Sequence, residues 1–554
     1  MTEAEEIVAG AGVAVPDAAD GEQAKEEKKS ASTVLVELAQ ASYRFGVSEA
    51  GETFGVPRVG SPVVFLLRGG KTSLRAQLAR AYFARVRKAA PQQALADALL
   101  VIEGFAQEEN PERLEIRVAR SDGAFWLDLG DPTGRAVRIK PGGWTIEDEP
   151  PVLFKRTALT LPLPLPVRGG SLDELWEWLN FDPADRPLVV AWLVSLFFPE
   201  MPHPVPNLSG EQGSGKSTAG KVMSLIVDPT GAPARKAPRD PESWVTAATG
   251  SWVVSLDNLS DMPPWLSDAI CRAVTGDGDV RRKLYTNTDL EVISFRRCVI
   301  LNGIDLGAVR GDLADRLIPL DLLIIGEDNR LEEEELWPSW QEAHPRILGA
   351  VLDMLASVAS QLPSVRLARK PRMADFARIL KAVDELSGTD GLARYLSKQK
   401  ALATDSLTAD VFIVAVAEKI DTTFTGTASE LLVLVTPDDD GKWRAPKGWP
   451  GTARAVTTRL RRQAPPMRKA GWMVEDDGGA NHSNAVRWTL TPPPREVGDS
   501  GSLGSHSSRS LQGREFASQA SQENGPSQVV PCTRCGLPLH PAAAAGGHTT
   551  HPSC

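Results

Sequence analysis

The stretch Gly210-Glu-Gln-Gly-Ser-Gly-Lys-Ser217 decides the fold of the centre of this chain. Its spacing, Gly-x4-Gly-Lys-Ser, is that of a phosphate-binding loop, in which glycines let backbone N–H groups turn toward phosphate oxygens. Lys216 supplies a positive charge for the β- and γ-phosphates, and the Ser217 hydroxyl can hold Mg²⁺. Residues 218–227 have helical spacing, so a helix N-terminus would face the phosphates. We therefore predict that ATP and Mg²⁺ bind to Gly210, Glu211, Gln212, Gly213, Ser214, Gly215, Lys216, Ser217 and Thr218.

Two apolar segments further along the chain each end in a polar side chain. Trp252-Val-Val-Ser-Leu-Asp257 reads as a strand that ends in a carboxylate, and Cys298-Val-Ile-Leu-Asn302 as one that ends in an amide. A carboxylate at this position can hold Mg²⁺, and an amide can contact the γ-phosphate or the attacking water. Asn258 stands where a glutamate would activate that water, and an amide cannot accept the proton. The sequence therefore predicts nucleotide binding more directly than hydrolysis.

Arg316 follows Asp312-Leu-Ala-Asp315 and precedes an apolar strand. One interpretation is a surface residue paired with Asp312 or Asp315. The other is an arginine finger, which would reach the nucleotide of a neighbouring subunit and neutralise charge in the transition state. Under the second interpretation, hydrolysis depends on assembly, and the predicted catalytic residues are Lys216, Asp257, Asn302 and Arg316.

These residues follow one another in the order used by the superfamily-3 helicases of phages and plasmids, which are AAA+ ATPases. The ordered set also includes Thr275-Gly-Asp-Gly, Arg281-Arg-Lys-Leu-Tyr285, Pro345-Arg-Ile-Leu-Gly349 and Pro371-Arg-Met-Ala-Asp-Phe376. Over about residues 170–490 the chain resembles the helicase part of primase–helicase proteins of actinobacterial phages or mobile elements. That resemblance implies a homo-oligomeric ring, usually hexameric, that moves along single-stranded DNA. Residues 32–165 show no acidic pair for a polymerase centre.

The resemblance also implies that Arg281, Arg282 and Lys283 lie on a hairpin in the ring channel. The residue types support contact with nucleic acid independently, because consecutive cations can track phosphates and the following Tyr285 can stack on a base. An exposed basic turn is the alternative.

The chain as a whole has the composition of a globular protein with several domains. It has 554 residues, 42% of them hydrophobic, and a net charge of −10, which excludes a wholly basic nucleic-acid coat. Helical spacing over 74–86, strand-like segments at 125–129 and 136–139, and strand–helix alternation over 170–325 predict an α/β fold with an N-terminal α+β part. The expected divisions are an acidic disordered tail (1–31), an α+β domain (32–166), a P-loop AAA+ core (167–329), a helical lid (330–404), a winged-helix-like domain (405–495), a flexible linker (496–530) and a zinc-binding tail (531–554).

A basic segment lies near the end of the predicted winged helix. Between residues 442 and 469 there are nine Lys or Arg and no Asp or Glu. Thr427-Ala-Ser-Glu430 is a capping box that opens a helix, residues 451–463 form a second helix, and residues 472–474 and 486–490 form two strands. Pro465-Pro466 is expected to break the second helix. We predict that Arg454, Arg459, Arg461 and Arg462 contact duplex DNA; a solvated face or a protein-docking module are the alternatives.

Three of the five cysteines lie in the last 23 residues. Cys532-Thr-Arg-Cys535 and His551-Pro-Ser-Cys554 form a C-x2-C…H-x2-C pattern, and three thiolates with one imidazole are a common structural Zn²⁺ site. His540 and His548 are alternative ligands, and incidental residues on a disordered tail are the other interpretation. A catalytic zinc is not expected, because all four positions would be filled by protein.

The remaining features indicate a reduced, cytoplasmic protein without a membrane anchor. The most apolar run, residues 188–198, has 11 residues, whereas a membrane helix needs about 20, and the first 30 residues are acidic rather than signal-like. The favoured function is an ATP-driven DNA helicase or translocase that acts in replication of a phage or mobile element. The alternatives are an ATP-dependent DNA-binding regulator or initiator with little hydrolysis and, less favoured, an ATPase that loads another helicase.

Overall fold

The structure is a computed structural model that describes residues 29–68, 73–260, 262–282, 290–303, 311–408, 410–437, 443–446, 448–478 and 486–493. For residues 277–282 and 290–294, and for positions 311, 329 and 406, only the backbone is described. By its internal contacts the chain divides after Pro493, and the second unit, residues 494–554, lies outside the described residues. None of the described helices is long and apolar enough to cross a membrane.

The first described elements are three helices and a small antiparallel sheet. They are α1 (Ala31–Ser42), β1 (Tyr43–Val47), β2 (Thr53–Pro57), β3 (Phe65–Leu66), α2 (Leu74–Val86) and α3 (Gln92–Gln107). Leu35, Leu78 and Ile102 are fully buried where the helices pack together, so this segment has a hydrophobic core of its own. The helix predicted over residues 74–86 is present as α2 with those bounds.

A second antiparallel sheet follows, with strands in the order β5-β6-β7-β8. The strands of this region are β4 (Leu114–Glu115), β5 (Val118–Ser121), β6 (Ala124–Asp128), β7 (Ala136–Lys140), β8 (Gly143–Glu147) and β9 (Leu153–Phe154). The inward side chains Phe125, Val137 and Trp144 share one core with the helices that follow. Residues 161–166 form no helix, as their prolines predict, yet Leu163 is buried in that same core. Residues on both sides of residue 166 therefore share one hydrophobic core.

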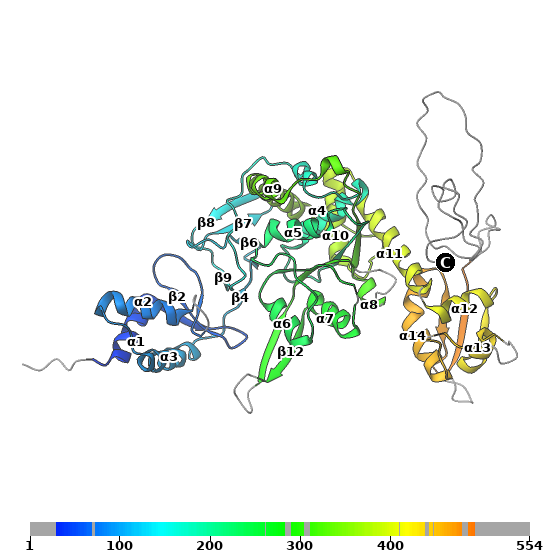
Figure 1. Ribbon diagram of the computed structural model, residues 1–554, viewed down its shortest axis with the longest axis horizontal. Coiled ribbons are helices and arrows are strands. Elements are labelled where there is room, and N and C mark those ends of the chain that lie inside the picture. Colours follow the sequence, from blue (N-terminus) through cyan, green and yellow to red (C-terminus); the bar gives the residue numbers. More distant parts are fainter. Residues whose placement is uncertain are drawn as a thin grey trace, which may run out of the picture. The chain divides into compact units, whose positions relative to one another are not determined.

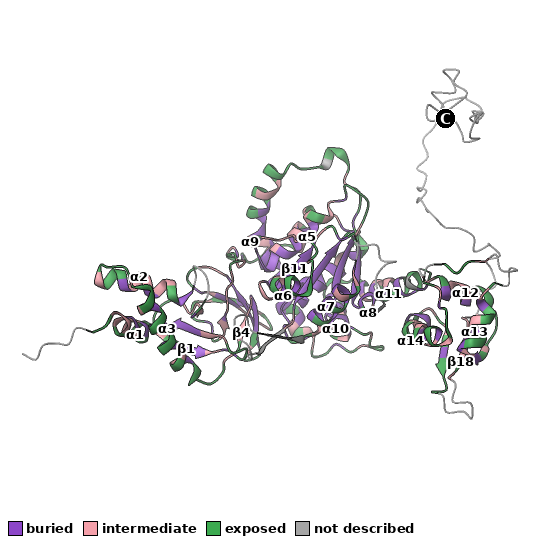
Figure 2. Ribbon diagram, turned by 60° about the horizontal axis from the view of Figure 1, so that its bottom comes forward, coloured by how far each residue is buried: buried purple, intermediate pink, exposed green. Residues whose placement is uncertain are grey.

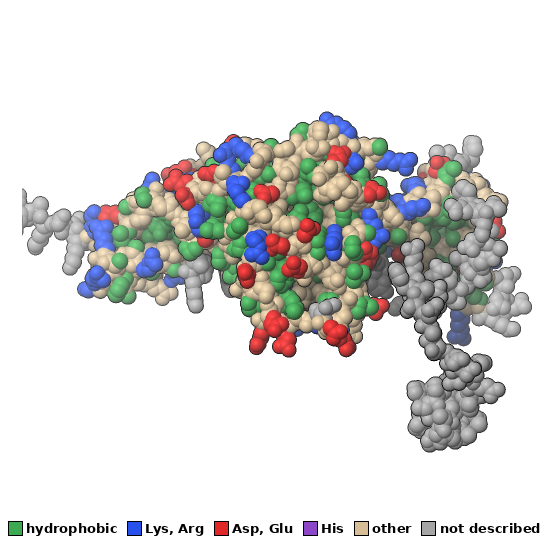
Figure 3. All heavy atoms as spheres, turned by 90° about the horizontal axis from the view of Figure 1, so that it is seen from above, with side chains coloured by type: hydrophobic (Ala, Val, Ile, Leu, Met, Phe, Trp, Pro, Cys, Tyr) green, Lys and Arg blue, Asp and Glu red, His purple; other side chains and the backbone are tan. Residues whose placement is uncertain are grey.

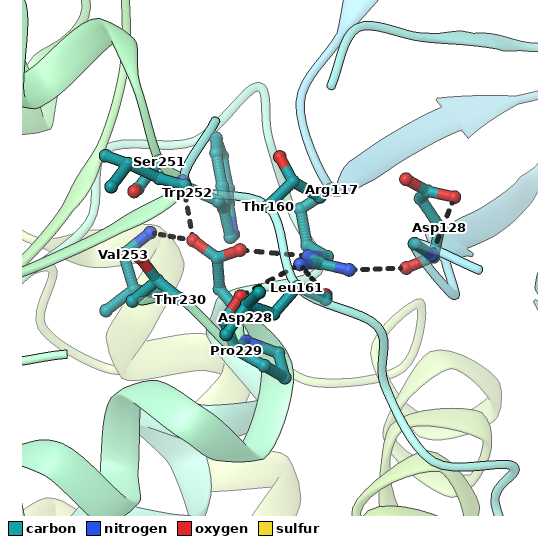
Figure 4. Close-up of polar contacts among 12 residues, drawn as sticks. Arg117, Asp128, Thr160, Leu161, Asp228, Pro229, Thr230, Ser251, Trp252 and Val253 are labelled. Carbon is teal, nitrogen blue, oxygen red and sulfur yellow. Dashed lines mark hydrogen bonds and ion pairs between the residues drawn. The ribbon is translucent and has the colours of Figure 1, made fainter. Parts of the chain in front are cut away.

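Arg117 ties this sheet to the next domain through a buried cluster (Figure 4). Its Nε donates to Asp228 Oδ1 at 2.9 Å, and its other nitrogens donate to the carbonyl oxygens of Asp128, Leu161 and Pro229. The second carboxylate oxygen of Asp228 accepts from the backbone N–H groups of Trp252 and Val253 at 2.8 and 3.0 Å. Both side chains are less than 5% exposed, so water does not solvate their charges. The hydrogen bonds within the cluster take the place of that hydration.

A four-stranded parallel sheet forms the centre of the chain, in the order β11-β14-β10-β15. Figure 2 shows its strands as buried. The strands and neighbouring helices are α4 (Arg186–Ser195), β10 (Val205–Ser209), α5 (Lys216–Val227), α6 (Pro241–Thr249), β11 (Val253–Leu256), α7 (Pro264–Thr275), β14 (Cys298–Asn302) and β15 (Leu317–Asp321). Pro206 is tolerated within β10 because the pairing with β14 begins only at Asn207. The apolar run over residues 188–198 is a buried helix and the turn after it, as expected.

Two further features complete this domain. Strands β12 (Asp277–Arg282) and β13 (Leu290–Phe295) form an antiparallel hairpin that extends away from α6 and α7 (Figure 1). The short helix α8 (Gly311–Ala314) precedes β15, and the predicted helical segment consists of α9 (Glu333–Gln361), α10 (Ala374–Ser387) and α11 (Gly391–Thr408). Ile347, Val351 and Leu355, spaced four residues apart, are buried along one face of α9.

The last described elements form a separate core in the order helix, strand, two helices, two strands. They are α12 (Val411–Lys419), β16 (Phe424–Thr427), α13 (Ala428–Val435), α14 (Ala453–Lys469), β17 (Met473–Asp476) and β18 (Arg487–Thr491), and the sheet order is β16-β18-β17. The capping box of Thr427 and Glu430 is present.

The predicted break at Pro465-Pro466 is wrong, because α14 continues through both prolines to Lys469. An interior proline removes one helical hydrogen bond and costs about 3 kcal/mol. Here Pro466 and Met467 are buried against the core of this segment, and Ala470 N donates to Pro466 O at 3.0 Å. Burial of the last turn offsets the missing hydrogen bonds.

Candidate functional site

The phosphate-binding loop joins the end of β10 to the start of α5. Gly210, Gly213 and Gly215 have φ values of +151°, +86° and +78°, a region that favours glycine. A Cβ atom at Gly210 would lie 2.7 Å from Ser214 Oγ and 2.9 Å from Leu322 O, so the tight turn excludes larger residues. Lys216 Nζ donates to Gly210 O at 2.7 Å and to Glu211 O at 2.8 Å. These two hydrogen bonds hold the ammonium group against the backbone at the start of the loop.

Three predicted side chains meet beside this loop. Ser217 Oγ donates to Asp257 Oδ1 at 3.0 Å, and the Asn302 amide donates to the same carboxylate oxygen. Asn302 Nδ2 also lies 3.4 Å from Ser217 Oγ. A hydroxyl and a carboxylate are the hard oxygen ligands that Mg²⁺ prefers, so these residues fit the predicted metal–nucleotide complex.

The order of the strands explains why these side chains meet. Strand β14 lies between β10 and β11, with Leu208 opposite Asn302 and Leu256 opposite Leu301. All three strands are parallel, so their carboxyl ends share one edge of the sheet, where α/β proteins bind ligands. Past this edge Asn258 has a left-handed backbone, φ +54°, and Leu259 N donates to Asn302 O at 2.9 Å.

Two buried polar atoms at this edge have no hydrogen-bond partner within the described part of the chain. They are Ser214 Oγ, in the loop, and Asn302 Oδ1, beside Asp257. A buried polar group without a partner costs about 1–3 kcal/mol. A ligand that supplies donors here, such as metal-bound water, would satisfy them.

Arg316 is paired within its own chain. Its Nη1 donates to Asp312 O at 2.6 Å and lies 3.0 Å from Asp312 Oδ1, and the residue is only 8% exposed. Burial raises the pKa of the Asp312 carboxyl, but the hydrogen bond and charge of Arg316 outweigh it and hold that pKa below its ordinary value. Arg372 Nη2 also contacts Asp312 Oδ1 at 2.8 Å. Of the two sequence interpretations, the pairing with Asp312 is therefore present.

The predicted DNA-contacting arginines of α14 differ in their surroundings. Arg459 is held by Gly448 O at 2.5 Å and Asp410 at 3.4 Å, and Arg461 is 3.5 Å from Asp476. Among the described residues, none forms an ion pair with Arg454 or Arg462. Arg454, Arg459 and Arg462 line a cavity of about 620 Å³ together with Trp449 and Thr452.

Several predicted site residues lie outside the side chains that the structure describes. Arg281 and Arg282 lie in β12, described by its backbone alone, and Lys283 and Tyr285 lie outside the described residues. Cys532, Cys535, His551 and Cys554 also lie outside them. Elsewhere, the face seen in Figure 3 carries interspersed acidic and basic side chains rather than a field of one sign.

Two residues that no sequence motif predicts also lie at the loop. Ile325 and Arg330, in the connection from β15 to α9, approach Gly215 and Gly213. They belong to no motif, so only their position relative to the loop singles them out.

Comparison with known families places these features in context. Residues 172–405 match the model of the actinomycete integrative conjugative element replication protein, and residues 412–505 match the model of the AICE RepA C-terminal domain. The chain is similar to replication proteins of conjugative elements. The first match contains the phosphate-binding loop, Asp257, Asn302 and Arg316, and the second contains α14. No curated protein sequence matches the chain.

Solved structures give weaker similarities. The A form apo structure of the NrS-1 C-terminal region has 11% sequence identity and a TM-score of 0.36, with 82% of this chain and 99% of that chain covered. The X-ray structure of JCV helicase has 13% identity and a TM-score of 0.19, with 42% of this chain and 70% of that chain covered. These TM-scores and identities are too low to assign a function to this chain.

Proposed function

We propose that this protein is an ATP-dependent DNA helicase or translocase that acts in replication of a mobile genetic element. The observation that carries the proposal is the meeting of Ser217, Asp257 and Asn302 at one sheet edge, beside the loop whose carbonyl oxygens hold Lys216. The match to a replication-protein family of conjugative elements supports the biological setting. DNA and Mg-ATP are the proposed ligands, and a homo-oligomeric ring is the proposed assembly.

In this proposal each residue has a separate role. The loop N–H groups and Lys216 bind the β- and γ-phosphates, while Ser217 and Asp257 hold Mg²⁺. Asn302, already hydrogen-bonded to Asp257, orients the attacking water or the γ-phosphate. Asn258 cannot act as a general base, so positioning and electrostatic stabilisation carry the catalysis.

A strand-displacement assay with a forked duplex tests the function. We expect single-stranded DNA to stimulate ATP turnover and unwinding to require hydrolysable ATP. Tight duplex binding without unwinding, and turnover indifferent to single-stranded DNA, would instead support an ATP-dependent DNA-binding regulator. Asn258 in place of a glutamate is the observation that favours that second candidate.

Arg316 is the proposed arginine finger toward the neighbouring subunit. In this role its guanidinium leaves the ion pair with Asp312 and contacts the phosphates of the nucleotide bound to the neighbour. We expect Arg316→Ala to retain ATP binding but lose about 10³-fold or more of its turnover, the size of a missing arginine finger. Steady-state turnover and fluorescent-nucleotide binding on the assembled protein measure the two effects.

Arg372→Ala is the matched control, because it also removes a cation from Asp312. We expect it to change turnover by no more than a few-fold. Normal turnover of the assembled Arg316→Ala protein would show that the finger assignment is wrong.

Helix α14 is the proposed duplex-binding element, in the manner of a winged helix. Arg454 and Arg462, which have no ionic partner among the described residues, are free to neutralise phosphates, whereas Arg461 is opposite Asp476. We expect the Arg454→Ala/Arg462→Ala double variant to lower the slope of log K against log salt for duplex DNA by roughly 1.8, at about 0.9 per lost phosphate contact. Fluorescence anisotropy across salt concentrations gives this slope.

Arg461→Ala serves as the control on the same helix, with the slope expected to fall by less than about 0.9. An unchanged slope in the double variant would show that Arg454 and Arg462 do not contact duplex DNA and would contradict the assignment of duplex binding to α14.

We also propose that Cys532, Cys535, His551 and Cys554 bind a structural Zn²⁺. Thiolate and imidazole are the ligands that this ion prefers, and the two tight pairs suit tetrahedral coordination. A unit this short buries too little apolar surface to be stable without the metal.

A further inference from the structure

Residues 322–331, which connect β15 to α9, run along the phosphate-binding loop. Leu322 N donates to Ser209 O at 2.8 Å, so the pairing of β15 with β10 continues to the last residue before the loop. Leu323 N donates to Asn180 O at 2.9 Å, and Asn180 Nδ2 donates back to Leu323 O at 2.5 Å. The start of this segment is therefore fixed in register with the loop.

Two side chains of the segment lie against the glycines of the loop. A Cβ atom at Gly215 would be 3.0 Å from Ile325 Cδ1, and one at Gly213 would be 3.1 Å from Arg330 Nη2. Because Gly213 and Gly215 have no side chains, Arg330 and Ile325 can approach the loop backbone at these two points. Among the described residues, none forms an ion pair or a side-chain hydrogen bond with the Arg330 guanidinium.

The segment also exposes aliphatic side chains next to a polar loop. Leu323 is 47% exposed, Ile324 is 60% exposed and Leu331 is 57% exposed. Exposed aliphatic groups beside a planar guanidinium that has no partner among the described residues match the chemistry of a nucleobase. A base has flat apolar faces and a π-system that stacks with arginine. In the proposed function, the loop N–H groups and Lys216 bind the phosphates.

We propose that residues 323–331 form the wall of the site that binds the nucleoside half of a nucleoside triphosphate. In this arrangement Arg330 stacks its guanidinium on the base and Ile324 packs against the base edge, with Ile325 filling the space at Gly215. The proposal rests on the proposed function, because it needs a triphosphate in the loop.

The test compares Mg-ATP with Mg-tripolyphosphate, which has the phosphates but no nucleoside. Displacement of a fluorescent ATP analogue gives both affinities on the full chain. We expect wild-type protein to prefer ATP, Arg330→Ala to weaken ATP about tenfold and Ile324→Ala about threefold, and both variants to leave tripolyphosphate within twofold. Arg330→Lys keeps the charge without the planar group and should behave like Arg330→Ala.

Arg369→Ala removes another exposed arginine, between α9 and α10, and should leave both affinities unchanged. Because Arg330 and Ile324 are exposed, their variants should melt at the wild-type temperature. Equal weakening of ATP and tripolyphosphate, or full rescue by Arg330→Lys, would mean that Arg330 contacts phosphate and would overturn the proposal. Wild-type protein that binds neither compound would instead overturn the proposed function itself.

Discussion

Replacing Lys216 by alanine is expected to abolish ATP turnover and to weaken Mg-ATP binding at least 100-fold. The ammonium lies across the mouth of the loop, 2.7 and 2.8 Å from the carbonyl oxygens of Gly210 and Glu211. In the proposed complex this ammonium pairs with the β- and γ-phosphates, and removing one such electrostatic contact costs about 3 kcal/mol. Calorimetric titration with Mg-ATP measures the affinity, and phosphate release measures the turnover.

Lys221→Ala provides the control on the same helix. Lys221 lies 4.0 Å from Glu333 and over the Trp337 ring, outside the loop, so its loss should leave nucleotide affinity unchanged. Retention of tight Mg-ATP binding by the Lys216→Ala protein would contradict the assignment of the loop.

Arg117→Ala is expected to have the largest effect on stability. It removes the guanidinium from a buried pair in which Arg117 and Asp228 side chains are 1% and 4% exposed. Asp228 would remain as a buried carboxylate beside Trp252 and Val253, and breaking such a pair costs about 3–5 kcal/mol. Urea denaturation followed by tryptophan fluorescence should show the corresponding fall in the midpoint.

Arg120→Ala is the matched comparison in the adjoining strand. Arg120 and Glu200 are each 46% exposed and 3.7 Å apart, so loss of this pair should change the free energy of unfolding by less than about 1 kcal/mol. Removing the orphaned charge as well, with Asp228→Asn in the Arg117→Ala background, should recover part of the lost stability. Equal midpoints for the Arg117→Ala and wild-type proteins would show that the buried cluster contributes little.

Local sequence patterns are sufficient to predict the helices and strands that carry the candidate site. Short apolar runs predict the strand that precedes Asp257 and the strand that ends at Asn302. Spacing predicts α2, and a capping box predicts α13. The sequence predicts a break at Pro465-Pro466 that the structure does not have, because apolar contacts offset the cost of the two prolines. A proline is visible in the sequence, whereas the burial that compensates for it is a long-range property.

By itself the sequence determined which residue types can bind a triphosphate, because the glycine spacing and the strand-end side chains are local chemistry. Only the tertiary structure decided that β14 lies between β10 and β11, which brings Asn302 within 3.4 Å of Ser217 across 85 residues of chain. It also decided that Arg316 faces Asp312, that Arg117 joins two sheets through Asp228, and that Arg330 lies against Gly213. Such contacts depend on strand order and on the burial of charge, which are set by the packing of the whole chain rather than by any short stretch of it.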